Sequence, residues 1–179
     1  MKAAMNGATV DRVFLDYSVK KLRQQSKRIQ DCLSRLEDAQ VWLRGSEQEN
    51  AIGNLVLHLC GNVRQWIVSG VGGSVDQRNR DREFTARGAV TRAELAARLD
   101  ETIDEATRVL AGVTAERLLD TIVIQGYEVT VMESVYHVVE HFSGHTGQII
   151  FATKAITSSD LGFYPHLGVT GTPHREQTP

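Results

Sequence analysis

The sequence lacks the features that would mark an extracellular or membrane protein. Its 179 residues contain no apolar run of 18 residues, no pattern typical of a signal peptide and only two cysteines. These absences exclude a transmembrane helix, and we expect a cytoplasmic protein with no membrane partner. The formal net charge is only −2, with acidic and basic residues interspersed. This balance lacks the positive field that nucleic-acid binding needs, so we expect no nucleic-acid partner.

The two cysteines offer no sign of a disulfide, redox or cysteine-metal site. Cys32 and Cys60 lie inside apolar-periodic segments, and neither has a partner at a metal or redox spacing. We interpret both as buried thiols of a reducing compartment. Cys60 is two residues from His58, and such neighbours point to roughly opposite faces of a helix. Cys60 is therefore not counted as a metal ligand.

Proline is also scarce, and all three prolines follow residue 160. The chain length suits one domain with a substantial core and is short for two. We predict a single domain over residues 1–160 and an irregular C-terminal tail over residues 161–179, with a partly docked start at Phe163 and Tyr164.

Apolar periodicity predicts four long helices and one small β-hairpin, an all-α fold class. Capping boxes at Thr91-Arg92-Ala93-Glu94 and Thr130-Val131-Met132-Glu133 indicate the starts of the third and fourth helices. The turn dipeptide Gln125-Gly126 follows β-branched residues and predicts the hairpin before the last helix. The predicted elements are helices over 9–37, 50–69, 91–111 and 130–157, a loop over 70–90, and a hairpin within 118–130.

The last helix carries His137, His141 and His145 at successive steps of four residues. Each such step overshoots a helical turn by only about 40°, so two imidazoles on successive turns can share one metal ion. Three histidines in this series span about 12 Å, which is too far for all of them to reach one ion. His137 is accordingly assigned to the surroundings of the site or to the core, and a third ligand must come from elsewhere.

The second helix offers that ligand. Asn54, His58 and Asn62 recur at steps of four in an otherwise apolar segment, and buried polar side chains need partners. We predict that His58 reaches across the bundle to His141 and His145. The alternative is a core histidine hydrogen-bonded to a neighbouring helix, in a bundle that binds no metal.

Three neutral imidazoles leave at least one coordination position open, as in catalytic rather than structural metal sites. We expect a divalent ion, zinc or nickel first, while cobalt, manganese and iron also fit the ligand set. The sequence assigns no catalytic residue. Glu133 and Glu140 are candidates to orient an imidazole or to act as a general base, with surface carboxylates as the alternative.

The charged run from Arg78 to Phe84 lies in the predicted loop and has two interpretations. It is either a solvated loop or a cover over the mouth of the histidine site, where an arginine would hold an anionic group of a substrate.

The segment His141-Phe142-Ser143-Gly144-His145-Thr146-Gly147-Gln148, coupled to an upstream helical histidine, resembles the DinB/YfiT-like superfamily of proposed metalloenzymes. The resemblance covers nearly the whole chain. Asn54 to Asn62 and Arg80 to Phe84 look closer still to a subgroup of undefined function. The resemblance implies an up-and-down-like four-helix bundle with a divalent metal held by three histidines, which correspond to His58, His141 and His145.

Members of that superfamily with known chemistry include bacillithiol-using S-transferases and the mycothiol-dependent maleylpyruvate isomerase. The commoner ending of the motif is His-His-Arg-Gly-Gln, whereas this sequence has Thr146 in place of the arginine. The leading hypothesis is a metal-dependent transferase or hydrolase that acts on a small molecule, with a low-molecular-weight thiol as a candidate partner. The alternative is a non-catalytic metal- or ligand-binding stress-response module. Apolar residues such as Val10, Phe14 and Trp42 also suggest a homodimer.

Overall fold

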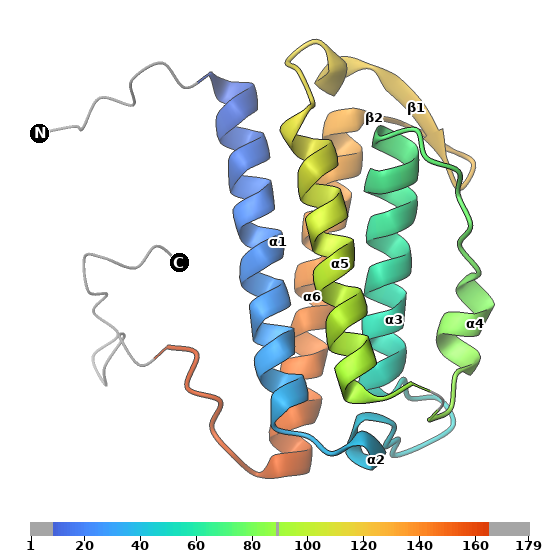
Figure 1. The fold of residues 1–179 in the computed structure, drawn as a ribbon, viewed down its shortest axis with the longest axis vertical. Coiled ribbons are helices and arrows are strands. Elements are labelled where there is room, and N and C mark those ends of the chain that lie inside the picture. The colour runs from blue at the N-terminus through green and yellow to red at the C-terminus, as the bar shows by residue number, and fades with distance from the viewer. Residues whose placement is uncertain (1–8, 89, 165–179) are drawn as a thin grey trace, which may run out of the picture.

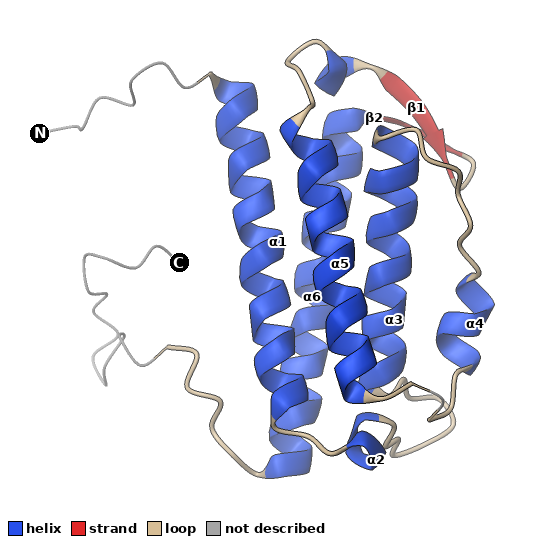
Figure 2. Ribbon diagram, in the orientation of Figure 1, coloured by secondary structure: helices blue, strands red, loops and turns tan. Residues whose placement is uncertain are grey.

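In the computed structural model, which describes residues 9–88 and 90–164, four long helices form a bundle with a small hairpin at one end (Figures 1 and 2). α1 packs against α5 and α6, and α3 packs against the same two helices. The predicted all-α fold class, a four-helix bundle with a β-hairpin before the last helix, is confirmed. The four helices are α1 (Val10–Ser34), α3 (Ile52–Val63), α5 (Arg92–Ala111) and α6 (Val131–Thr157).

Both predicted capping boxes are confirmed. The hydroxyl of Thr91 accepts from the backbone N–H of Glu94 at 3.2 Å, while the Glu94 carboxylate accepts from the backbone N–H of Thr91 at 2.8 Å. At the start of α6 the hydroxyl of Thr130 accepts from the backbone N–H of Glu133 at 3.1 Å, and the Glu133 carboxylate accepts from the backbone N–H of Thr130 at 2.7 Å. Each cap stabilises its helix by about 1 kcal/mol and fixes its first residue. Because the first residue of α6 is fixed, the positions of the α6 histidines along the bundle axis are fixed as well.

The hairpin consists of β1 (Thr121–Ile124) and β2 (Tyr127–Thr130), which pair antiparallel with Ile124 opposite Tyr127. Gln125 and Gly126 both have positive φ, 54° and 81°, as a two-residue type I′ turn requires. Ile124 is buried, so the hairpin closes that end of the bundle.

The second predicted helix changes its hydrogen-bond pattern part of the way along. α3 continues into a π-helix, η1 (Arg64–Val71), in which Gly72 donates to the carbonyl of Ile67, five residues back, at 2.9 Å. The wider turn is a frequent feature near functional sites. Apolar periodicity cannot distinguish these two kinds of turn.

The predicted loop over residues 70–90 contains a short helix, so that part of the prediction was wrong. α4 (Arg80–Thr85) begins after Asn79, whose side chain accepts from the backbone N–H of Arg82 at 3.2 Å. A second short helix, α2 (Asp38–Val41), and a 3₁₀ turn, η2 (Arg117–Leu119), were also not predicted. Helices of this length lack the repeats that make a period visible.

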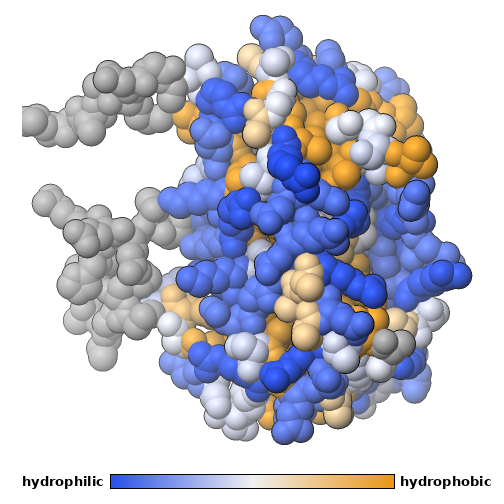
Figure 3. All heavy atoms as spheres, viewed as in Figure 1, coloured by the Kyte–Doolittle hydropathy of each residue, from blue (hydrophilic) through white to orange (hydrophobic). Residues whose placement is uncertain are grey.

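The surface bears on the predicted homodimer. Val10 is exposed and Phe14 packs against the core, while Trp42 is partly buried and its indole N–H donates to the carbonyl of Val90 at 2.9 Å. Much of the apolar surface of Trp42 is therefore used within the chain, and the homodimer stays a prediction. In Figure 3 the visible face is mostly hydrophilic, with hydrophobic residues gathered toward the hairpin end. Within residues 9–88 and 90–164, no helix is long and apolar enough to cross a membrane.

The chain leaves α6 through Ser158, which has a left-handed φ of 51°. Leu161 is buried, and the rings of Phe163 and Tyr164 lie 5.7 and 5.0 Å from the guanidinium of Arg28. The start of the predicted tail thus contacts α1. The remainder of that tail, residues 165–179, lies outside the described residues.

Candidate metal centre

The structure brings His58 of α3 together with His141 and His145 of α6. One ring nitrogen from each can be chosen so that all three lie within 4.8 Å of one another, a group that could hold a metal ion. The Nε2 atoms of His58 and His141 are 2.9 Å apart, and the ring centroids of His141 and His145 are 4.5 Å apart. Residues 83 positions apart in the chain therefore meet at one point between two packed helices.

The tautomer of His58 is set by a carboxylate that lies outside the bundle helices. Glu83 of α4 places Oε2 2.9 Å from Nδ1 of His58. Since a carboxylate only accepts, Nδ1 of the neutral imidazole carries the proton and Nε2 keeps its lone pair. That lone pair points toward His141, the direction a shared ligand would need.

Glu83 is itself held by Arg78 through two hydrogen bonds, Nε to Oε1 at 2.8 Å and Nη2 to Oε2 at 2.9 Å. The two side chains are only 4% and 9% exposed. Burial acts to raise the pKa of Glu83, but the hydrogen bonds from Arg78 and His58 outweigh it and lower that pKa. Glu83 is therefore an ionised carboxylate that is fixed from both sides.

His145 has an orienting partner of its own. Its Nδ1 lies 2.8 Å from Oε1 of Gln148, one turn further along α6. The amide oxygen accepts, so Nδ1 is protonated and Nε2 is the free nitrogen. Gln148 belongs to the segment from which the superfamily was inferred, and its role in the structure is to orient this imidazole.

Burial favours the neutral form of the three histidines on α6, because it lowers the pKa of each. Burial is the main cause that lowers the pKa of His141 to about 4, and the nearby His145, His58 and His137 lower it further. Burial likewise lowers the pKa of His145 and of His137. Neutral imidazoles are the form that binds metal, so the site keeps its lone pairs available at neutral pH.

The lowered pKa of His141 predicts a pH-dependent stability of the metal-free protein. A histidine with an ordinary pKa of 6.5 when unfolded and about 4 when folded favours the folded state fully above 6.5. This contribution is lost as the pH falls from 6.5 toward 4. We expect the free energy of unfolding to drop by about 1 kcal/mol between pH 7 and pH 5 from this group, after allowance for solvent screening. Urea unfolding in a chelator checks this, and a His141→Gln variant should decline less steeply; equal declines would contradict it.

His137 lies beside the cluster rather than in it, consistent with the predicted assignment. Its ring is 4.1 Å from that of Trp66 and 5.5 Å from that of His141. Neither predicted carboxylate orients an imidazole. Glu133 is engaged in the α6 capping box, and Glu140 is exposed and acts on His137 only through its charge. The orienting carboxylate is Glu83, which the sequence analysis did not single out.

The three polar residues at steps of four on α3, Asn54, His58 and Asn62, differ in their hydrogen-bond partners. Nδ2 of Asn54 donates to the carbonyls of Glu83 and Ala86 at 2.8 and 3.1 Å, so Asn54 binds the α4 segment and not a facing helix. His58 alone reaches α6. Oδ1 of Asn62 is buried and has no hydrogen-bond partner among residues 9–88 and 90–164.

The charged run from Arg78 to Phe84 does fold over the histidine site. The ring of Phe84 lies 4.8 Å from that of His58, and Nη2 of Arg78 lies 3.1 Å from its Nδ1. The guanidinium of Arg78 binds Glu83, so this arginine is not available to a substrate group. Thr146, which stands where the commoner motif has arginine, is buried and donates to the carbonyl of Phe142 at 2.8 Å.

Gly61 makes room for Glu83 beside α3. A Cβ atom at this position would collide with Oε1 of Glu83 and would lie 3.0 Å from Nε of Arg78. A glycine inside a helix costs about 0.5–1 kcal/mol relative to alanine. Its presence one turn after His58 is the signal in the sequence that could have indicated a close approach at this point.

We therefore expect Gly61→Ala to lower the free energy of unfolding by about 1–3 kcal/mol, because Glu83 must move away from His58. Gly144→Ala is the matched control, since a Cβ there meets nothing within 4 Å on α6. The control should gain about 0.5–1 kcal/mol from helix propensity alone. Urea unfolding of the two variants measures the difference, and an equal gain at both positions would show that Glu83 does not need this space.

Comparison with known proteins agrees with the fold. A family model described as "Protein of unknown function (DUF1572)" matches residues 9–164. A comparison with curated proteins gave no match.

Solved structures similar to this chain include the following three. A conserved protein from Enterococcus faecalis has 14% identity and a TM-score of 0.69, with 80% of this chain and 97% of that chain covered. A DinB-like protein from Bacillus subtilis has 16% identity and a TM-score of 0.64, with coverages of 83% and 97%. A mycothiol-dependent maleylpyruvate isomerase has 13% identity and a TM-score of 0.59, with coverages of 80% and 65%. At these identities the likeness establishes a DinB-like fold and nothing more.

Proposed function

The chain belongs to the DUF1572 family, whose function is unknown, and from this premise and its DinB-like fold we propose that it is a metal-dependent enzyme acting on a small molecule. In this proposal His58, His141 and His145 hold one divalent ion, with zinc or nickel as the first candidates. The reaction is a transfer or a hydrolysis.

The observation that carries the proposal is the convergence of three imidazoles, two of which are oriented through their other nitrogen. Glu83 and Gln148 hold the Nδ1 atoms of His58 and His145, and Nε2 of His58 is directed toward His141. Three nitrogens bound to one zinc ion at 2.0–2.1 Å lie about 3.3 Å apart, and these side chains need only small movements to reach that spacing. The donor set therefore fits a divalent ion of borderline softness.

The open side of the cluster supports a catalytic role over a purely structural one. His141 and His145 are partly exposed, so a substrate can reach them, and structural metal sites are closed by four protein ligands. A bound divalent ion in such a site supplies Lewis acidity and lowers the pKa of a coordinated water or thiol. His137 is partly buried, largely neutral at pH 7 and adjacent to His141, so one of its ring nitrogens can accept a proton from the substrate.

The substrate is proposed only as a chemical class. The mycothiol-dependent relative makes a low-molecular-weight thiol a candidate partner, and a soft thiolate suits zinc or nickel. Thr146, at the position of the motif arginine, is uncharged and buried. A thiol partner would have to be bound by other residues. We further propose a cytoplasmic protein that acts as a homodimer.

Metal analysis of protein purified without an affinity tag tests the proposal, together with an assay for small-thiol transfer before and after chelation. We expect about one divalent ion per chain and a turnover that chelation removes and the same ion restores. A stoichiometric ion without turnover on any thiol or ester substrate would favour the alternative, a non-catalytic binding module. Protein that neither retains nor takes up zinc or nickel would refute the metal site itself.

A further inference from the structure

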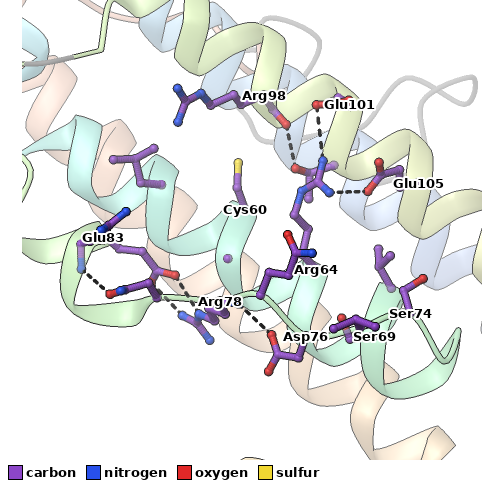
Figure 4. Close-up of a pocket in the computed structure, with 18 of the residues that line it drawn as sticks. Cys60, Arg64, Ser69, Ser74, Asp76, Arg78, Glu83, Arg98, Glu101 and Glu105 are labelled. Atoms are coloured by element: carbon purple, nitrogen blue, oxygen red, sulfur yellow. Dashed lines mark hydrogen bonds and ion pairs between the residues drawn. The ribbon is translucent and has the colours of Figure 1, made fainter.

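A second concave site lies on a different face of α3 from the histidine cluster. A cavity of about 1060 Å³ opens between α3 with η1, α5, and the segment 74–90 (Figure 4), and none of the three clustered histidines lines it. Leu57, Cys60 and Arg64 line this cavity, whereas Nε2 of His58 is directed toward His141 of α6. Its volume is at the upper end of the range that small-molecule sites occupy, about 300–1,000 Å³.

Each carboxylate of this cavity is already bound by other groups of the protein. The cavity lining contains four carboxylates, those of Asp76, Glu83, Glu101 and Glu105. Arg64 forms ion pairs with the last two at 3.4 and 2.7 Å, and Figure 4 shows its guanidinium turned toward them. Arg78 donates to Asp76 through its backbone N–H at 2.9 Å and to Glu83 through its side chain. Three of the four carboxylates thus contact an arginine, and Asp76 is held by hydrogen bonds from the backbone N–H of Arg78 and the side-chain amide of Gln65.

Two exposed arginines of the lining have guanidinium groups without a partner among the described residues. Arg82 of α4 and Arg98 of α5 line the cavity, and neither guanidinium makes a hydrogen bond or an ion pair with the part of the chain that the structure describes. The field of Arg98 reaches Cys60, where it acts to lower the pKa of the thiol. Guanidinium groups in this state match the planar oxygens of carboxylate, phosphate or sulfonate groups. With Arg108 the lining holds five arginines against four carboxylates, a net formal charge of +1, and the guanidinium groups of Arg82 and Arg98 are available to a ligand.

The floor between these cations is apolar and unreactive. Cys60 is 7% exposed, and burial raises the pKa of its thiol to about 11, so it is uncharged at neutral pH. In Figure 4 its sulfur lies between α3 and α5, on the side of Arg98. Leu57, Val68 and Val109 extend the same surface. Such a floor accommodates an apolar body and offers no nucleophile, which points to binding rather than chemistry.

We propose that this cavity is a second small-molecule site that takes an amphipathic anion, with the anionic group at Arg82 and Arg98 and the apolar body on the floor around Cys60. The site is independent of the proposed metal function. It needs no ion and shares with the histidine cluster only the wall formed by Arg78 and Glu83.

The probe pair 8-anilinonaphthalene-1-sulfonate and its neutral analogue N-phenyl-1-naphthylamine tests this site in the full chain, treated with a chelator. We expect saturable binding of the sulfonate, seen as enhanced fluorescence, and weaker binding of the neutral analogue. Arg82→Gln and Arg98→Gln should each raise the Kd of the sulfonate by about two- to fivefold, as the loss of one partly exposed charge pair implies, and leave that of the analogue unchanged.

Two controls locate the probe. Arg23→Gln removes one charge from an exposed ion pair with Asp104 outside this cavity, and it should leave the Kd unchanged. An equal loss in Arg23→Gln, or no loss in the Arg82 and Arg98 variants, would overturn the site. His141→Ala should also bind the sulfonate normally. If His141→Ala lost sulfonate binding, the sulfonate would be bound at the histidine cluster. That outcome would refute this second site and leave the proposed metal function standing.

Discussion

His141→Ala and His145→Ala should each abolish stoichiometric zinc or nickel binding while the protein stays helical and folded. Each change removes one of only three imidazoles that converge within 4.8 Å. The loss of an orienting partner outside the ligand shell typically costs about 10–100-fold in metal affinity, so the loss of a ligand should cost more than that. Isothermal titration of chelator-treated protein, with far-UV circular dichroism as the check on folding, measures both expectations.

His137→Ala is the matched control for these two variants. It removes a histidine from the same face of α6, one turn before His141, but His137 packs against the ring of Trp66 and is not among the three that converge. Metal binding should survive this change. Stoichiometric metal in both His141→Ala and His145→Ala would mean that the histidines form a hydrogen-bonded core and not a metal site.

The long elements could be predicted from the sequence because each carries its own local signal. Thr91 with Glu94 and Thr130 with Glu133 mark helix starts through contacts between residues three apart. Gln125-Gly126 marks the hairpin through its positive φ angles. The convergence of His58 with the α6 histidines was predictable for a different reason, since a polar side chain in an apolar helix needs a partner. The regular spacing on α6 supplied that partner.

The network behind His58 could not be predicted, because it depends on contacts that leave no periodic trace. Glu83 lies in a six-residue helix inside a dense run of charged residues, and the sequence pattern does not distinguish it from the neighbouring acidic residue. Glu83 reaches His58 because Gly61 leaves space for its carboxylate and because Arg78, five residues away, binds that carboxylate. Asn54 was expected to find a partner on a facing helix and instead binds the backbone of this segment. Periodicity reports which face is buried, and not which loop covers it.

Glu83→Leu should both weaken metal binding and destabilise the fold. Without the carboxylate, Nδ1 of His58 loses its acceptor, and we expect the metal Kd to rise about 10–100-fold. The change also leaves the guanidinium of Arg78, only 4% exposed, without its counter-charge. Breaking a buried ion pair from one side costs about 3–5 kcal/mol, because a buried charge is left uncompensated.

A double variant separates these two effects. Replacing both partners of a buried pair by apolar side chains is often close to neutral for stability, so Arg78→Met/Glu83→Leu should recover most of the lost unfolding free energy. It should not recover metal affinity, since His58 still lacks its acceptor. Glu140→Gln is the control, because this carboxylate is exposed and has no hydrogen bond to the cluster. If metal affinity returned together with stability in the double variant, Glu83 would serve only to neutralise Arg78, and the orientation of His58 would have to come from helix packing alone.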